Sequence, residues 1–198
     1  MKLKFSGKKL GRYLSFALFV TVLGAVVCNA SPITYNVDRT VGSGTVTGFI
    51  QTDGTLGVLN PGNILNWSLA LVVGVDSYNL YGPSSGNNSS VYGSGVDTTA
   101  TPTLLLFNFS GTDNGYFLFQ YGVGIHNGYH YYCDATFSGI CLQGETDAPA
   151  YFGAGQTTTP SGNVVIGTAS AVPEPGTMLL MGSGLIGAIG AVRRKLAK

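Results

Sequence analysis

The chain has 198 residues, and nine of its ten Lys and Arg residues lie within the first 12 or the last six. Residues 31–172 therefore carry only Arg39 against eight acidic side chains, a net charge of −7. This acidic middle disfavours nucleic-acid binding, which requires clustered Lys and Arg to neutralise phosphates. A content of 10% charged residues with 30 glycines also disfavours a helical cytosolic enzyme.

Residues 1–30 predict a secretory signal peptide. The basic stretch from Lys2 to Arg12 is followed by an apolar run over residues 13–27. Cys28 and Ala30 then supply the small residues that signal peptidase requires before its cleavage point. We expect cleavage after Ala30, with a retained N-terminal anchor as the alternative.

Residues 31–172 predict one all-β domain, an antiparallel β-sandwich or jelly-roll-like fold. The segment 65–73 has large apolar residues at every odd position, with Asn66 and Ser68 between them. This period of two is typical of a half-buried strand, in which Trp67 is the best core anchor. Further strands are expected at residues 33–37, 44–51, 77–81, 103–109, 116–121, 128–134 and 164–168.

Local signals add turns and one short helix to this fold. Asp53-Gly54 predicts a turn, and Asp113-Asn114-Gly115 predicts a hairpin between two aromatic-rich runs, because Asn and Gly tolerate positive φ. Residues 60–65 fit a short helix with Pro61 in its first turn.

One motif matches a hydrolase pattern. The run Gly82-Pro-Ser84-Ser-Gly86 fits the G-x-S-x-G nucleophile elbow, and Asp97 or Asp113 and then His126 follow in the order Ser–Asp–His. An elbow requires a strand before the serine and a helix after it, whereas polar loop residues continue here. We therefore expect a surface loop and no catalytic residues, and keep an envelope hydrolase as an alternative.

Metal sites are weakly indicated. His126 and His130 lie four residues apart near Cys133 and Asp134, but Asn127-Gly128 disfavours the helix that would bring both imidazoles to one face. The scattered acids Asp113, Glu145 and Asp147 are of the type that binds Ca²⁺, without an EF-hand spacing. A polar exposed turn is favoured for the histidines, and no cofactor is expected.

Two cysteines remain once the signal peptide is removed. Cys133 and Cys141 are separated by seven residues, and in an oxidising envelope such a pair is expected to form a disulfide.

The C-terminus has three parts in a fixed order. Pro173-Glu174-Pro175 is followed by residues 176–192 without a charge, and then by Arg193 and Arg194 in a basic tail. A helix of that apolar length spans about 25 Å, near the short limit for a bilayer, and its basic end would stay cytoplasmic. An ordinary C-terminal anchor would fit this pattern as well.

Residues 173–198 resemble the PEP-CTERM sorting signal of exopolysaccharide-producing Gram-negative bacteria. The resemblance implies recognition by an exosortase, a membrane protease that cuts near Pro-Glu-Pro, followed by release or attachment at the outer surface. A second segment, Gly44-Thr-Val-Thr-Gly followed by Thr52-Asp-Gly-Thr and Asn63-Ile-Leu-Asn-Trp67, is similar to a segment of secreted PEP-CTERM proteins. That segment implies a fold and a location but no activity.

The sequence thus predicts a non-enzymatic cell-surface or extracellular-matrix protein. Its expected partners are an exosortase and, transiently through the C-terminal helix, the inner membrane, with no nucleic acid. The alternative is a carbohydrate-binding module for extracellular polysaccharide. Tyrosines suited to stacking on sugar rings would then be Tyr116, Tyr129 and Tyr131.

Overall fold

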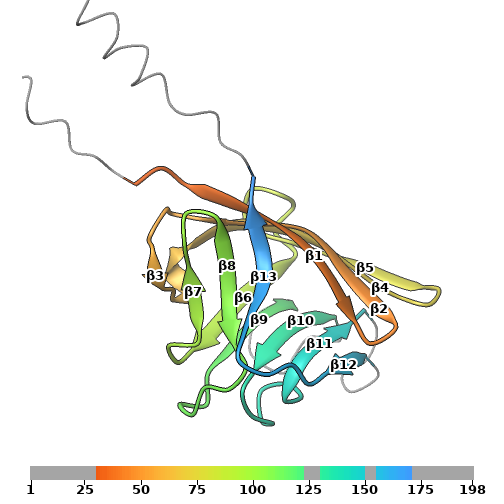
Figure 1. Cartoon of the computed structure of the whole chain (residues 1–198). Helices are drawn as coiled ribbons and strands as arrows, with labels where there is room; N and C mark the ends of the chain where they lie inside the picture. Colours follow the sequence, from red (N-terminus) through yellow and green to blue (C-terminus); the bar gives the residue numbers. More distant parts are fainter. Residues whose placement is uncertain (1–29, 123–129, 150–154, 171–198) are drawn as a thin grey trace, which may run out of the picture. The chain divides into compact units, whose positions relative to one another are not determined.

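The computed structural model describes residues 30–122, 130–149 and 155–170. These residues form two β-sheets in which every strand pair is antiparallel, so the expected all-β, two-sheet architecture is confirmed (Figure 1). All strands lie in the unit that begins at Ser31. The predicted signal peptide and C-terminal helix fall outside the described residues. Within the described part, no helix is long and apolar enough to cross a membrane.

The larger sheet has eight strands in the spatial order β3-β7-β8-β13-β1-β2-β4-β5. Their bounds are β1 Ile33–Val41, β2 Gly44–Thr52, β3 Gly57–Val58, β4 Ile64–Val73, β5 Asp76–Tyr81, β7 Thr98–Ala100, β8 Leu104–Asn108 and β13 Asn163–Ala169. The smaller sheet has the order β12-β11-β10-β9-β6. It contains β6 Ser89–Ser94, β9 Tyr116–Tyr121, β10 Tyr131–Ala135, β11 Gly144–Ala148 and β12 Gln156–Thr158.

The two sheets share one apolar core, to which Trp67 is central. Its side chain on β4 is 3% exposed and meets Phe119 of β9 edge to face, with 5.4 Å between ring centroids. Trp67 Nε1 also donates to Ser89 Oγ on β6 at 2.8 Å, so the indole contacts two strands of the opposite sheet. The prediction that Trp67 anchors the core is therefore confirmed.

The alternation of β4 fails at one position. Leu65 is 42% exposed, while Ile64 is buried. A bulge opposite Gln51 and Thr52 explains the difference, because Thr52 pairs with Ile64 and Gln51 pairs with Asn66, which leaves Leu65 out of the ladder. An extra residue of this kind reverses the face on which the preceding side chain lies.

The expected hairpin at residues 113–115 is wrong. The chain passes there from β8 in the larger sheet to β9 in the smaller sheet. Asn114 does adopt the expected positive φ of 55°. However, Asp113 Oδ2 accepts from the N–H of Val96 at 2.7 Å, which fastens this segment to the β6–β7 loop instead of closing two paired strands.

Other differences concern short or polar elements. The helix expected at residues 60–65 is a single 3-10 turn, Pro61–Asn63. The strand expected at 128–134 is described from Tyr131 onward, as β10. Strands β3, β6, β7, β11 and β12 were not anticipated, because they are very short or consist largely of polar residues.

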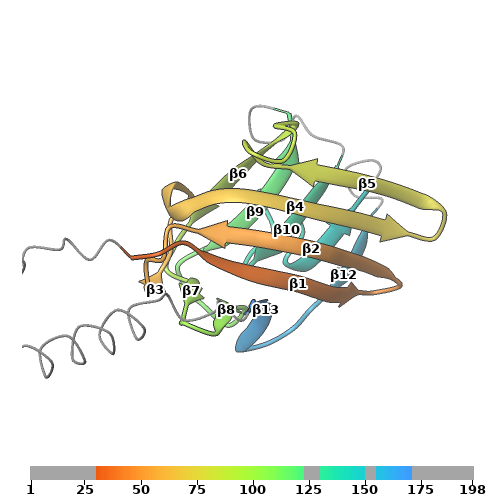
Figure 2. The same cartoon turned by 90° about the horizontal axis from the view of Figure 1, so that it is seen from above.

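The chain enters and leaves the domain at the same end. β1 and β13 are antiparallel neighbours, with Tyr35 opposite Ala169. Beyond β13, Ser170 donates its N–H to the carbonyl of Thr34 at 2.8 Å and its hydroxyl to Asn36 Oδ1 at 3.1 Å. Figure 2 shows β3 on the side where β1 begins, opposite the tips of the β1–β2 and β4–β5 hairpins.

Candidate functional site

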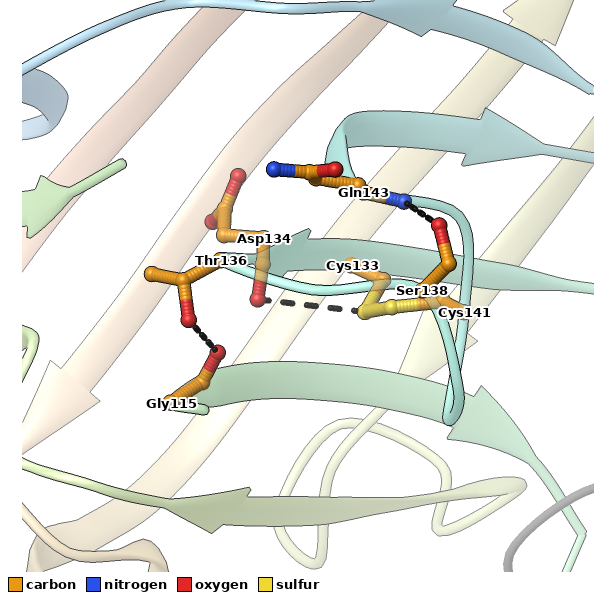
Figure 3. The surroundings of a disulfide bond; sticks show 7 residues. All are labelled: Gly115, Cys133, Asp134, Thr136, Ser138, Cys141 and Gln143. Atoms are coloured by element: carbon orange, nitrogen blue, oxygen red, sulfur yellow. Dashed lines mark hydrogen bonds between the residues drawn. A yellow bond between two sulfur atoms is a disulfide. The ribbon is translucent and has the colours of Figure 1, made fainter. Parts of the chain in front are cut away.

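The disulfide between Cys133 and Cys141 is present, as predicted (Figure 3). Cys133 lies on β10 and Cys141 in the loop before β11, and both are buried. Gln143 N–H donates to Ser138 Oγ within that loop at 3.3 Å, and Thr136 Oγ1 donates to the Gly115 carbonyl at 3.1 Å.

The disulfide loop helps to cover the outer face of the smaller sheet. The two cysteines form a second apolar cluster there with four other buried residues, Leu118, Tyr131, Ala135 and Ala148. A disulfide that closes so short a loop stabilises the fold by roughly 2–3 kcal/mol in the loop-entropy model.

The inner face of the smaller sheet is divided between aromatic and acidic side chains. Phe117 and Phe119 of β9 are buried against the core. On the neighbouring strands, Tyr132 lies opposite Asp147 and Asp134 lies opposite Glu145. All four of these polar residues are fully buried. We name Asp134, Glu145 and Asp147, with Tyr132 and Arg39, the acidic cluster.

Arg39 of β1 joins the larger sheet to this cluster. Its Nε donates to Glu145 Oε1 at 2.8 Å and its Nη2 donates to Glu145 Oε2 at 2.7 Å, a two-point ion pair. Tyr132 donates its hydroxyl to the same Oε1 at 2.8 Å. Three charge-assisted hydrogen bonds thus satisfy one buried carboxylate, and the hydrogen bond to Glu145 raises the pKa of Arg39 further above its usual value.

The other two carboxyls have no such partner. Both oxygens of Asp134 and of Asp147 are shielded from solvent and lack a well-formed hydrogen bond within the described residues. Burial, followed by the charge of Glu145, raises the pKa of Asp134 well above its ordinary value. Burial also raises the pKa of Asp147 to about 7, an effect that the backbone of Val72 partly opposes. Because both shifts favour the neutral carboxyl, they reduce the negative charge that Arg39 has to balance beside Glu145.

A separate pair of carboxyls connects two loops. Asp97 is 4% exposed and hydrogen-bonds to Asp113. Burial and this contact raise the pKa of Asp97 to about 6, whereas that of Asp113 is lowered. A Cβ at Gly111 or Gly115 would collide with the Asp97 carboxyl, so these glycines allow the β8–β9 segment to close over it. Below about pH 6, a protonated Asp97 can therefore donate to Asp113 and connect the two loops.

The hydrolase residues do not come together in the described structure. Ser84 lies in the β5–β6 loop, where its N–H donates to Asn66 Oδ1 at 3.0 Å, and turns rather than a helix follow it. Asp97 and Asp113 are occupied with each other, and His126 lies outside the described residues.

The residues considered as metal ligands are also dispersed. Asp113 pairs with Asp97, whereas Glu145 and Asp147 belong to the acidic cluster. In the described ranges, no three His, Cys, Asp or Glu side chains are grouped so that they could hold a metal ion. His130 instead packs on a tyrosine ring, and its Nδ1 lies against the carbonyl of Pro149. His126 lies outside the described residues, so the predicted polar exposed turn stays a prediction.

The expected glycan contacts are corrected in part. Tyr131 is 1% exposed beneath the disulfide loop, so its ring is not accessible to a sugar. Tyr116 is half-buried against the same cluster, and Tyr129 lies outside the described residues.

A different group of rings reaches the surface. Tyr78 of β5 stacks on His130 with 3.7 Å between centroids, and Tyr121 of β9 meets Tyr78 edge to face at 5.5 Å. Tyr121 is 41% exposed. We name these three residues the aromatic cluster. Through Tyr78 and Tyr121 it connects β5 of the larger sheet to β9 of the smaller one. Local sequence patterns do not indicate this cluster, because Tyr78 on β5 lies far along the chain from Tyr121 and His130.

The described residues thus define an acidic, disulfide-containing, all-β domain. The model of the PEP-CTERM protein-sorting motif matches residues 171–195, which contain Pro173, Glu174, Pro175, Arg193 and Arg194. The chain therefore carries this sorting motif, as the sequence predicts, and the motif implies export and processing by an exosortase, a membrane protease. The matched residues lie outside the described structure. No curated protein and no solved structure matches the chain significantly.

Arg39→Met is expected to lower the free energy of unfolding by about 3–5 kcal/mol, because it leaves Glu145 buried without its counter-ion. Adding Glu145→Gln should restore most of that loss, since the charge disappears while an acceptor for Tyr132 remains. Urea unfolding followed by Trp67 fluorescence measures both effects, with the exposed Asp38→Asn as the matched control. A cost below about 1 kcal/mol for Arg39→Met would mean that the pair behaves as an exposed one.

The domain is expected to lose stability as the pH rises from about 4 to 7. The pKa of Asp147 is about 7 in the folded chain against 3.8 ordinarily, so the folded state holds a proton that the unfolded state has already released. Asp134 acts in the same direction. Urea midpoints at pH 5 and pH 8 measure the loss, and Asp147→Asn should flatten it, whereas the exposed Asp76→Asn should not. An equal slope in both variants would contradict this origin.

Proposed function

We propose that the protein is a non-enzymatic component of the cell surface or extracellular matrix in an exopolysaccharide-producing Gram-negative bacterium. The observation that carries this proposal is the PEP-CTERM protein-sorting motif at residues 171–195. In this proposal residues 1–30 are a signal peptide, residues 31–172 are the exported domain, and residues 173–198 are the sorting segment. Residues 176–192 cross the inner membrane as a helix until the exosortase acts.

The contacts of the described residues support a structural role for the domain. Ser84 and the Asp97–Asp113 pair are held in separate interactions, and the acidic cluster is buried between the sheets. The disulfide suits a domain that functions in an oxidising compartment.

A second candidate function is binding of extracellular polysaccharide. The aromatic cluster favours it, because Tyr121 is 41% exposed and its ring is supported by Tyr78. Partly exposed aromatic rings beside polar groups are the usual contacts of sugar rings. In this proposal, Tyr121 takes the place of the buried Tyr131.

Replacing Pro173, Glu174 and Pro175 together with Ala is expected to block sorting. In a host that contains an exosortase, the natural chain should appear outside the cell with a mass that lacks residues 1–30 and the C-terminal apolar segment. The triple variant should remain in the membrane fraction with that segment attached. Intact-mass measurement of both fractions distinguishes these outcomes, and Pro102→Ala, an exposed proline outside the motif, is the matched control. Release of the triple variant at the natural mass would refute exosortase sorting.

Tyr121→Ala is expected to weaken binding to the host's extracellular polysaccharide in a pull-down, because it removes the exposed ring of the aromatic cluster. Asn79→Ala serves as the control, since Asn79 is exposed on β5 next to Tyr78 but lies on the opposite face of the strand. Equal retention of the two variants, or no retention of the natural chain, would remove the carbohydrate-binding candidate.

A further inference from the structure

Several strand ends and one loop meet at the end of the domain where the chain enters and leaves. β1 begins there and β13 ends there, with Ser170 hydrogen-bonded to Thr34. Thr52, at the end of β2, pairs with both Ile33 and Ile64, which brings the β2–β3 loop and the start of β4 to the same end. We name this region, together with β3, the junction end.

The position of the sorting motif brings the junction end close to a membrane. Gly176, the first residue of the apolar segment, follows Ser170 by six positions. Six fully extended residues span about 20 Å at most. If residues 176–192 cross the bilayer, as proposed above, the bilayer surface lies within that distance of the end of β13. This step rests on the proposed function.

Exposed apolar side chains lie at this end. Leu56 in the β2–β3 loop is 52% exposed, Val58 of β3 is 43% exposed, and Leu65 of β4 is 42% exposed. Leu65 is exposed because the bulge in β4 removes it from the ladder. Figure 2 shows β3 on the side of the molecule where β1 begins, opposite the hairpin tips. Apolar side chains of this kind are compatible with the interfacial region of a bilayer.

Few acidic residues lie at the junction end. Of the eight acids in residues 31–172, only Asp53 lies at the junction end. Its carboxylate accepts from Thr55 N–H at 2.8 Å and from Asn63 Nδ2 at 3.0 Å, and these hydrogen bonds lower its pKa. The other seven lie along or beyond the far halves of the strands, or in the acidic cluster: Asp38, Asp76, Asp97, Asp113, Asp134, Glu145 and Asp147.

This charge distribution favours one orientation at a membrane. Anionic lipid headgroups repel carboxylates within a Debye length, about 10 Å at moderate salt. An approach by the junction end keeps most of the domain's negative charge beyond that range. An approach by the hairpin tips would bring Asp76 to the lipid surface first.

From this placement we infer that the junction end rests on the lipid surface while the C-terminal segment is inserted, with Leu56, Val58 and Leu65 in the headgroup region. The domain then stands with the β1–β2 and β4–β5 hairpin tips facing away from the membrane. The contact depends on the tether, because three partly exposed side chains surrounded by an acidic domain do not hold it to lipid alone. Cutting the tail therefore ends the contact.

The test uses the full chain and places one fluorophore either at the junction end of the domain or at its β4–β5 tip. Cys28→Ser removes the free thiol of the signal peptide, and Leu56→Cys or Val75→Cys supplies one site for labelling. Val75 is the matched control: it is an apolar residue, 99% exposed, at the β4–β5 tip. It follows Ile64 by 11 positions, so the length of β4 separates the two ends by about 30 Å. Fluorescence of Trp67, the single tryptophan, confirms in each labelled chain that the core is intact.

Each labelled chain is reconstituted in vesicles of phosphatidylethanolamine and phosphatidylglycerol that contain a nitroxide-headgroup lipid. Flotation with the vesicles first checks that the chain is anchored. Quenching at position 56 at least about twofold stronger than at position 75 is expected, because the control site lies roughly 30 Å further away. Flotation with equal quenching at both sites overturns the inference while leaving the anchor in place. Failure of the chain to float with the vesicles would overturn the proposal that residues 176–192 insert into the membrane. It would also overturn the inferred orientation of the domain.

Discussion

The fold of this domain depends on the ion pair between Arg39 and Glu145. Arg39 is the single cation of residues 31–172, and the pair connects β1 of the larger sheet to β11 of the smaller one. An isolated buried carboxylate is strongly disfavoured, so Glu145 can lie between the sheets only because Arg39 and Tyr132 meet it there. The pairing fixes how the sheets are aligned, since a shift of β1 by one residue would move Arg39 to the outer face.

The interior around this pair has two chemically different halves. Between β4 and β9, Trp67 and Phe119 form an apolar contact that tolerates changes of pH. Between the larger sheet and strands β10 and β11, burial raises the pKa of Asp134 and of Asp147, which favours their neutral forms. Burial thus couples proton binding by these two carboxyls to folding. The acidic half therefore makes packing of the smaller sheet sensitive to pH, while the aromatic half holds the two sheets together.

Sequence patterns predicted the parts of this structure that depend on local periodicity. The strand around Trp67 and the disulfide were accessible because alternation and cysteine pairing are properties of neighbouring residues. The acidic cluster was not, because Glu145 in a polar stretch is expected to face solvent, and its partner Arg39 is 106 residues away. For the same reason the 113–115 turn was assigned its correct backbone conformation but the wrong partner. The carboxyl that redirects it, Asp97, belongs to another loop.

The uneven charge of the chain is consistent with a protein whose location changes during its maturation. In the proposed precursor, the cations of both terminal segments lie on the cytoplasmic side of the membrane, where basic residues are favoured. Once they are removed, as proposed, an exported domain of net charge −7 remains, and anionic lipids repel it. Arg39 does not alter this behaviour, because its charge is consumed by Glu145 inside the fold. The cleavage that ends the tether would therefore also remove the basic segment that favours the membrane, and leave only the repulsion between the acidic domain and the lipid.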